Sequence, residues 1–172
     1  MDNPIVKIIL NDDREIFVEL YPEVAPKSVE NFLKLVEQKF YDGVIFHRII
    51  ANFMIQTGGY YVEDFTLFEK EEVESITGEF ASNDFKNDLK HELGVISMAR
   101  TSDPNSASSQ FFICSTACPH LDGQYAAFGK VIDEEGLKTV LDLSYVETMN
   151  IGAGFTDFPV ELISIKTIER AN

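Results

Sequence analysis

Tryptophan is absent from this sequence of 172 residues, and cysteine occurs only twice, at Cys114 and Cys118. No apolar run approaches the roughly 20 residues that a membrane-spanning helix needs. The first four residues, Met1 to Pro4, lack the basic start and the apolar stretch of a signal peptide. We therefore expect no contact with a membrane and a cytoplasmic location, where both thiols stay reduced.

Basic residues are also scarce. The 14 lysines and arginines stand against 29 acidic residues, which gives a formal net charge of −15. Such a chain repels phosphate backbones, so nucleic acid is not an expected partner. About half of the excess charge lies in one segment, Glu63–Glu92. We interpret this segment as a solvated loop region, with a docking surface for a basic partner as the alternative.

Material for a core is plentiful. Hydrophobic residues make up 45% of the chain, and 14 phenylalanines and 6 tyrosines supply large side chains. A chain of this length and composition can bury one sizeable core. We therefore expect a single domain over residues 1–172, and nothing in the sequence requires more than a monomer.

Short apolar runs between turn residues predict a mainly β protein. The expected strands are Ile5–Leu10, Glu15–Leu20, Val44–Ile50, Phe53–Gln56, Ser75–Phe80, Val95–Met98, Phe111–Cys114, Tyr125–Ile132 and Val160–Ile168. Many short strands favour a closed barrel or a sandwich.

Two helices are also expected. One begins at Pro26 and ends at Asp42-Gly43, because apolar residues recur there at helical spacing. These residues are Val29, Phe32, Leu33, Val36 and Phe40. The other helix follows Asp133, where acidic residues favour a helix start. The two helices could plug the open ends of a barrel.

Three familiar kinds of site find little support. A hydrolase needs a nucleophile with a histidine base, and no Gly-x-Ser-x-Gly elbow is present. Cys114, Cys118 and His120 match no zinc spacing, and buried thiols are the simpler interpretation. Gly152-Ala153-Gly154 lacks the third glycine of a dinucleotide fingerprint.

A different arrangement surrounds Arg48, which lies inside an otherwise apolar strand. Because neighbouring residues of a strand face opposite ways, Arg48 points away from His47 and Ile49. An arginine beside apolar residues such as Phe53 and Phe112 would form an apolar pocket with a single fixed cation. Taken alone, Arg48 fits a surface position equally well, and the aromatic residues fit a plain core.

Three long motifs in this order resemble the cyclophilins, a family of peptidyl-prolyl cis/trans isomerases. The motifs are Phe46–Gly59, Gly94–Ile113 and Leu121–Val131, and the helix start Val24–Phe32 also fits. The likeness runs from about Ile5 to Ile168. The amino-acid sequence of Asp103–Gln110 resembles that of bacterial single-domain members of the family.

The resemblance implies an eight-stranded antiparallel closed barrel capped by two α-helices, with a substrate groove on its outer face. It also implies that X-Pro bonds of peptides and of unfolded or flexible protein segments are the substrates, without a metal or another cofactor. Arg48, Gln56 and Phe53 match the family's catalytic positions. The matching substrate-binding residues are Met54, Ala99, Arg100, Thr101, Gln110, Phe112, His120, Leu121 and Tyr125.

Two residues depart from the family pattern. His120 stands where many members have tryptophan, and Tyr125 stands where many have histidine. We expect turnover to survive, but we expect weak cyclosporin binding, because the tryptophan N–H that helps to hold cyclosporin is missing. A non-catalytic proline-peptide binding or chaperone module is the alternative. The matching Arg48 and Gln56 favour the enzyme.

Overall fold

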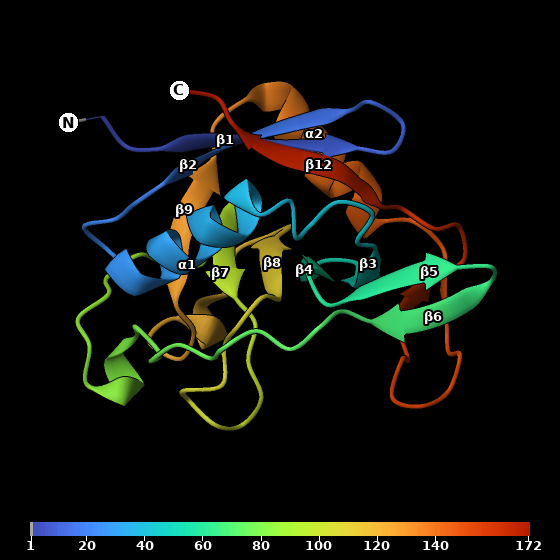
Figure 1. Cartoon of the computed structure of the whole chain (residues 1–172). Helices are drawn as coiled ribbons and strands as arrows, with labels where there is room; N and C mark the ends of the chain where they lie inside the picture. The colour runs from blue at the N-terminus through green and yellow to red at the C-terminus, as the bar shows by residue number, and fades with distance from the viewer. Residues whose placement is uncertain (1) are drawn as a thin grey trace.

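The fold follows from a computed structural model that describes residues 2–172. Its elements in chain order are β1 (Ile5–Leu10), β2 (Glu15–Leu20), α1 (Pro26–Glu37), β3 (Phe46–Ile50), β4 (Met54–Thr57), β5 (Tyr60–Glu63), β6 (Thr66–Glu69), the 3-10 helix η1 (Ala81–Asn83), β7 (Val95–Met98), β8 (Phe111–Cys114), the 3-10 helix η2 (Pro119–Leu121), β9 (Ala127–Val131), α2 (Glu134–Ser144), β10 (Thr148–Met149), β11 (Phe158–Pro159) and β12 (Ile165–Arg170). The chain is therefore mainly β with two α-helices, as expected (Figure 1).

Eight strands form one curled antiparallel sheet in the order β12-β1-β2-β9-β7-β8-β4-β3. The two end strands, β12 and β3, share no ladder, so the expected closed barrel is not confirmed and the sheet is a half-barrel. Residues at, or just before, the starts of β3 and β12 are still hydrogen-bonded to one another. The N–H of Gly43 donates to the carbonyl of Ile165 over 2.7 Å, and that of Phe46 donates to Ile163 over 2.9 Å.

The first two predicted strands form with the predicted bounds and pair as a hairpin. Val6, Ile8 and Leu10 of β1 are buried, whereas the residues between them are partly exposed. β2 pairs with β1 in register and buries its own alternate residues in the same core. Strand alternation therefore places one face of the hairpin inside the half-barrel.

Helix α1 fills the inside of the curled sheet with an aromatic cluster. The ring of Phe32 lies 5.3 Å from that of Phe111 on β8 and 5.4 Å from that of Phe128 on β9. The helix ends at Glu37, earlier than predicted, because Lys39 adopts a left-handed conformation with φ 58°. Phe40 is buried all the same, although it lies beyond the helix.

The second helix begins as predicted. The carboxylate of Asp133 accepts hydrogen bonds from the N–H of Gly136 in the first turn and from the N–H of Phe17 on β2, both over 3.0 Å. This side chain therefore caps α2 and ties it to the sheet.

The acidic segment differs from the prediction. It begins with an unexpected hairpin, β5–β6, and residues 75–80 form no strand although the structure describes all of them. The N–H of Ile76 donates to the carbonyl of Ala107, and that of Gly78 donates to the side chain of Asn105. Loop residues therefore accept hydrogen bonds from the backbone N–H groups that would otherwise pair with a neighbouring strand.

The last predicted strand is also shifted. Residues 160–164 leave the sheet between the short strand β11 and β12, and β12 begins only at Ile165. Pro159 ends β11, and Val160 and Leu162 are exposed. The N–H of Val160 donates to the carbonyl of Glu147 in the loop after α2, and Ser164 forms an isolated bridge with Ile45, so this stretch is paired elsewhere.

Glu79 is the one acidic residue of the segment that is buried, with 1% of its surface exposed. Its carboxylate accepts hydrogen bonds from the N–H groups of Lys27 and Ser28 and from the Ser28 hydroxyl. Ala25, at the cap position of α1, offers no side-chain oxygen. Glu79 therefore caps α1 from a distant part of the chain.

We predict that Glu79→Ala lowers the free energy of unfolding by about 2–3 kcal/mol, because buried donors at the helix start lose a charged acceptor. Urea unfolding measures this loss. Glu72→Ala is the matched control, since Glu72 is exposed and surface changes stay within about 0.5 kcal/mol. Equal stability of the two variants would show that the cap contributes nothing.

Candidate active site

Side chains alternate between two apolar clusters along β4 and β8. Ile55 and Phe111 belong to the main core inside the half-barrel. Met54 and Phe112, their neighbours in sequence, belong to a second cluster together with Leu121. Because neighbouring strand residues point to opposite faces, the second cluster lies on the outer face of the sheet.

A cavity of about 110 Å³ lies against this second cluster. Nine of the residues predicted for the site line it, namely Arg48, Phe53, Met54, Gln56, Ala99, Arg100, Phe112, Leu121 and Tyr125. The three others, Thr101, Gln110 and His120, lie outside the lining. The structure therefore gathers residues from four separate stretches of the chain at one place.

Arg48 lies on β3 directly opposite Gln56 on β4, with its side chain exposed. Its Nη1 donates to Oε1 of Gln56 over 3.2 Å. Nε2 of Gln56 in turn donates to Oε1 of Gln110 over 2.9 Å. This chain of amides holds the guanidinium at the mouth of the apolar cavity and leaves Gln56 one spare N–H.

Aromatic contacts set the walls of the cavity. The ring of Tyr125 meets that of Phe112 edge-on at 5.8 Å. The guanidinium of Arg100 is sandwiched 4.6 Å from the centre of the Tyr125 ring and 4.9 Å from that of Phe80. Arg100 is thus a packed part of the wall, because stacking and its bond to the carbonyl of Gln124 occupy its head group.

The residues outside the lining lie beside it. His120 is exposed on η2, and its ring lies 5.5 Å from that of Phe53. Thr101 is exposed and bonds to the hydroxyl of Ser106. Within the lining, the N–H of Ala99 already donates to the carbonyl of Gln110, so this N–H is not available to a ligand.

A polar trio supports Phe112 from behind, which the sequence did not reveal. The His91 ring stacks 6.1 Å from that of Phe112. Its Nδ1 donates to Asp122 over 3.0 Å, and its Nε2 accepts from the Ser97 hydroxyl over 2.9 Å. Ser97, His91 and Asp122 are hydrogen-bonded to one another in the same order as the side chains of a serine hydrolase triad. Ser97 is 0% exposed, however, so no substrate carbonyl can reach it.

The thiols do not form a nucleophilic or metal site either. Cys114 and Cys118 are both buried beside Met54, and burial raises the pKa of each thiol. Within residues 2–172, no group of three or more His, Cys, Asp or Glu side chains is placed to hold a metal ion. In the same range, no helix has the length and apolar character needed to cross a membrane.

The curled antiparallel sheet with an apolar cavity on its outer face, bordered by the guanidinium groups of Arg48 and Arg100, defines a class of half-barrel proteins. Residues 5–170 match the family described as cyclophilin type peptidyl-prolyl cis-trans isomerase/CLD. The chain belongs to this family, and peptidyl-prolyl cis-trans isomerisation is its activity.

Relatives and solved structures agree with this. The chain is 40% identical over 158 residues to a peptidyl-prolyl cis-trans isomerase of Acinetobacter baylyi, covering 88% of this chain and 79% of the relative. It is 44% identical over 133 residues to the human peptidyl-prolyl cis-trans isomerase-like 3, covering 77% of each. A crystal structure of a Cryptosporidium parvum cyclophilin has a TM-score of 0.79 at 29% identity, covering 99% of this chain and 98% of the other.

His47, the neighbour of Arg48, is buried on the other face of β3. Its ring packs 4.7 Å from that of Tyr60 and 6.3 Å from that of Phe155. Burial, aided by the charge of Arg48, lowers the pKa of His47 to about 4. The imidazole is therefore neutral at pH 7.

Acid should destabilise the protein through His47. Its pKa is lower in the folded chain than the ordinary value of 6.5, so its stabilising effect is complete above pH 6.5 and is lost as the pH falls toward 4. Between pH 7.5 and 4.5 we expect a loss of roughly 2–3 kcal/mol from this group. Urea unfolding of the wild type and of His47→Phe at both pH values measures it. Parallel pH dependence of the two proteins would contradict the prediction.

Proposed function

We propose that the outer cavity holds the proline ring of the substrate and that Arg48 promotes rotation about the bond before it. The observation that supports this is the exposed guanidinium of Arg48, held by Gln56 at the mouth of a cavity lined by Phe53, Met54 and Phe112. An apolar ring fits such a cavity, and a cation beside it can act on the adjoining bond.

The chemistry needs a donor that acts only on the twisted bond. Amide resonance keeps the X-Pro bond planar and slows its isomerisation to tens or hundreds of seconds. As the bond twists, resonance is lost and the proline nitrogen gains a lone pair. Arg48 donates a hydrogen bond to that lone pair, which the planar ground state does not offer. The interaction therefore stabilises the transition state selectively.

The remaining residues hold one side of the bond while the other turns. Leu121 and Tyr125 complete the walls around the proline ring. The spare N–H of Gln56, positioned by Gln110, donates to the carbonyl that precedes the proline. The carbonyl groups of the Ala99–Thr101 stretch are the proposed partners of the peptide backbone.

The proposed partners are proline-containing peptides and flexible protein segments. In support, a Cryptosporidium parvum cyclophilin with a TM-score of 0.77 at 31% identity, covering 98% of this chain and 99% of the other, was solved in the presence of the dipeptide Ala-Pro. The relatives described above are named as isomerases, which favours the enzyme over a non-catalytic binding module. A monomer in the cytoplasm is proposed from the low cysteine content and the net charge.

Removal of the donor tests the mechanism. Arg48→Ala should lower kcat/KM for a short Ala-Pro peptide by roughly 10²–10³-fold, the usual effect of losing one donor to the transition state. Arg170→Ala, which removes an exposed arginine of β12, is the matched control and should retain full activity. A protease-coupled isomerisation assay measures both. Arg48→Ala at the rate of the control would refute the proposed role.

Cyclosporin affinity tests the role of His120. We expect weak binding by the wild type and binding about five- to tenfold tighter by His120→Trp, because one added hydrogen bond contributes about 1 kcal/mol. Isothermal titration calorimetry gives both dissociation constants. Tight binding by the wild type, unchanged in His120→Trp, would show that this position does not limit affinity.

A further inference from the structure

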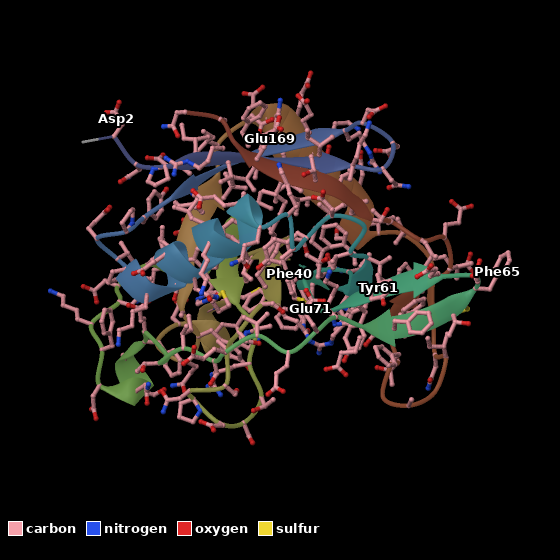
Figure 2. The ribbon with its side chains drawn as sticks, viewed as in Figure 1. Asp2, Phe40, Tyr61, Phe65, Glu71 and Glu169 are labelled. Carbon is pink, nitrogen blue, oxygen red and sulfur yellow. The ribbon has the colours of Figure 1, made fainter. Side chains whose placement is uncertain are left out.

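The turn of the β5–β6 hairpin carries an aromatic residue that the fold does not use. Asp64 and Phe65 connect Glu63 to Thr66, and both have positive φ, 49° and 61°. Two-residue turns of this kind favour glycine or asparagine, and a bulky residue with positive φ is an outlier. Phe65 is nevertheless fully exposed and extends from the tip of the hairpin (Figure 2). Neither burial nor backbone preference explains it.

The hairpin presents further aromatic surface beside this tip. Tyr61 and Phe68 lie opposite each other on β5 and β6, and their rings stack at 5.4 Å. Phe68 is 41% exposed. Lys70 lies over the rings of Tyr61 and Phe40, which ties the base of the hairpin to the body of the protein. The aromatic face is thus held in a defined position.

The charges around these rings are negative. Glu63, Asp64 and Glu69 lie on the hairpin, and within residues 2–172 none of the three forms an ion pair. An apolar surface with acidic groups around it is complementary to a chain that combines apolar and basic residues. A second copy of this protein is a poor partner, because each copy carries a net charge of −15.

The other face of the hairpin, which carries Tyr60, borders a cavity next to the proposed proline cavity, the outer cavity lined by Arg48 and Phe112. A cavity of about 200 Å³ is lined by His47, Arg48, Tyr60 and residues 153–157. Arg48 lines this cavity and the proline cavity alike, and Tyr60 is the first residue of β5. An extended chain leaving the proline cavity can therefore pass Arg48, cross the second cavity and reach the face of the hairpin that carries Tyr60 and Val62.

We propose that the β5–β6 hairpin and the cavity at its base form a second binding site for the same client chain. The site takes apolar and basic residues that flank the substrate proline. The inference rests on the proposed function of the proline cavity and adds a class of substrate to it. Long unfolded segments containing leucine and lysine are bound at two places, whereas short peptides are bound at one.

The test compares three peptides with the same central Ala-Pro bond. One has four residues, one has about twenty residues with leucine and lysine on both sides, and one has glutamate in place of each lysine. For the wild type we expect kcat/KM for the lysine peptide to exceed that for the short peptide by roughly tenfold, chiefly through a lower KM. The glutamate peptide should show no such advantage.

Phe65→Asn is the test variant, because asparagine suits the turn and keeps the hairpin formed. It should reduce the ratio of kcat/KM for the lysine peptide to that for the short peptide by about five- to tenfold. Its thermal stability should equal or exceed that of the wild type. Ile132→Asn, at an exposed apolar residue between β9 and α2, is the matched control and should retain the wild-type ratio.

Each outcome has one meaning. If the wild type does not isomerise the short peptide, the proposed function itself is wrong. If the short peptide is isomerised but Phe65→Asn keeps the wild-type ratio, the second site is refuted. Equal preference for the lysine and glutamate peptides also refutes it, because the acidic groups would then play no part.

Discussion

The alternation of side chains along β4 and β8 is the constraint on which the rest of this structure depends. Phe111 packs against α1 inside the half-barrel, and its neighbour Phe112 forms a wall of the proline cavity outside. A register shift of one residue would exchange the two faces and destroy the core and the cavity together. Folding stability and the proposed substrate binding therefore depend on the same few residues, which limits how far either can change alone.

The cavity is held in place by polar groups on two sides. In front, Gln56 and Gln110 orient the guanidinium of Arg48. Behind, His91 stacks on Phe112 and is itself held by Asp122 and Ser97. Burial lowers the pKa of His91, so its ring is neutral at pH 7 and adds no charge beside Phe112. Fully paired buried groups of this kind give a rigid, pre-organised site.

The sequence predicted the elements whose signal is local. Strands β1 and β2 follow from period-two alternation, and α2 follows from the acidic residues at its start. The β5–β6 hairpin was missed because its turn, Asp64-Phe65, lacks the usual glycine or asparagine. The predicted strand at 75–80 was wrong because its backbone bonds to a loop about 30 residues away. Such partners leave no trace in the spacing of nearby residues.

The same distinction applies to the site. Periodicity placed Arg48 on the opposite face of its strand from His47 and Ile49, but only the resemblance to a family assembled the twelve candidate residues on the outer face of the sheet. Contacts among residues far apart in sequence escaped both approaches. His47 meets Phe155 more than a hundred residues further on, and His91 meets Asp122, which is 31 residues further on. Each residue alone has no distinguishing neighbour in the chain, so only the folded structure shows the pairing.

The position of Arg48 between two cavities has a consequence for inhibitor design. Apart from Tyr125, the residues that line the proposed proline cavity match the family pattern, so a small molecule confined to it has few contacts by which to discriminate among family members. The neighbouring cavity is built around His47, Tyr60 and Phe155 and borders the same guanidinium. A compound that spans Arg48 would contact both cavities at once.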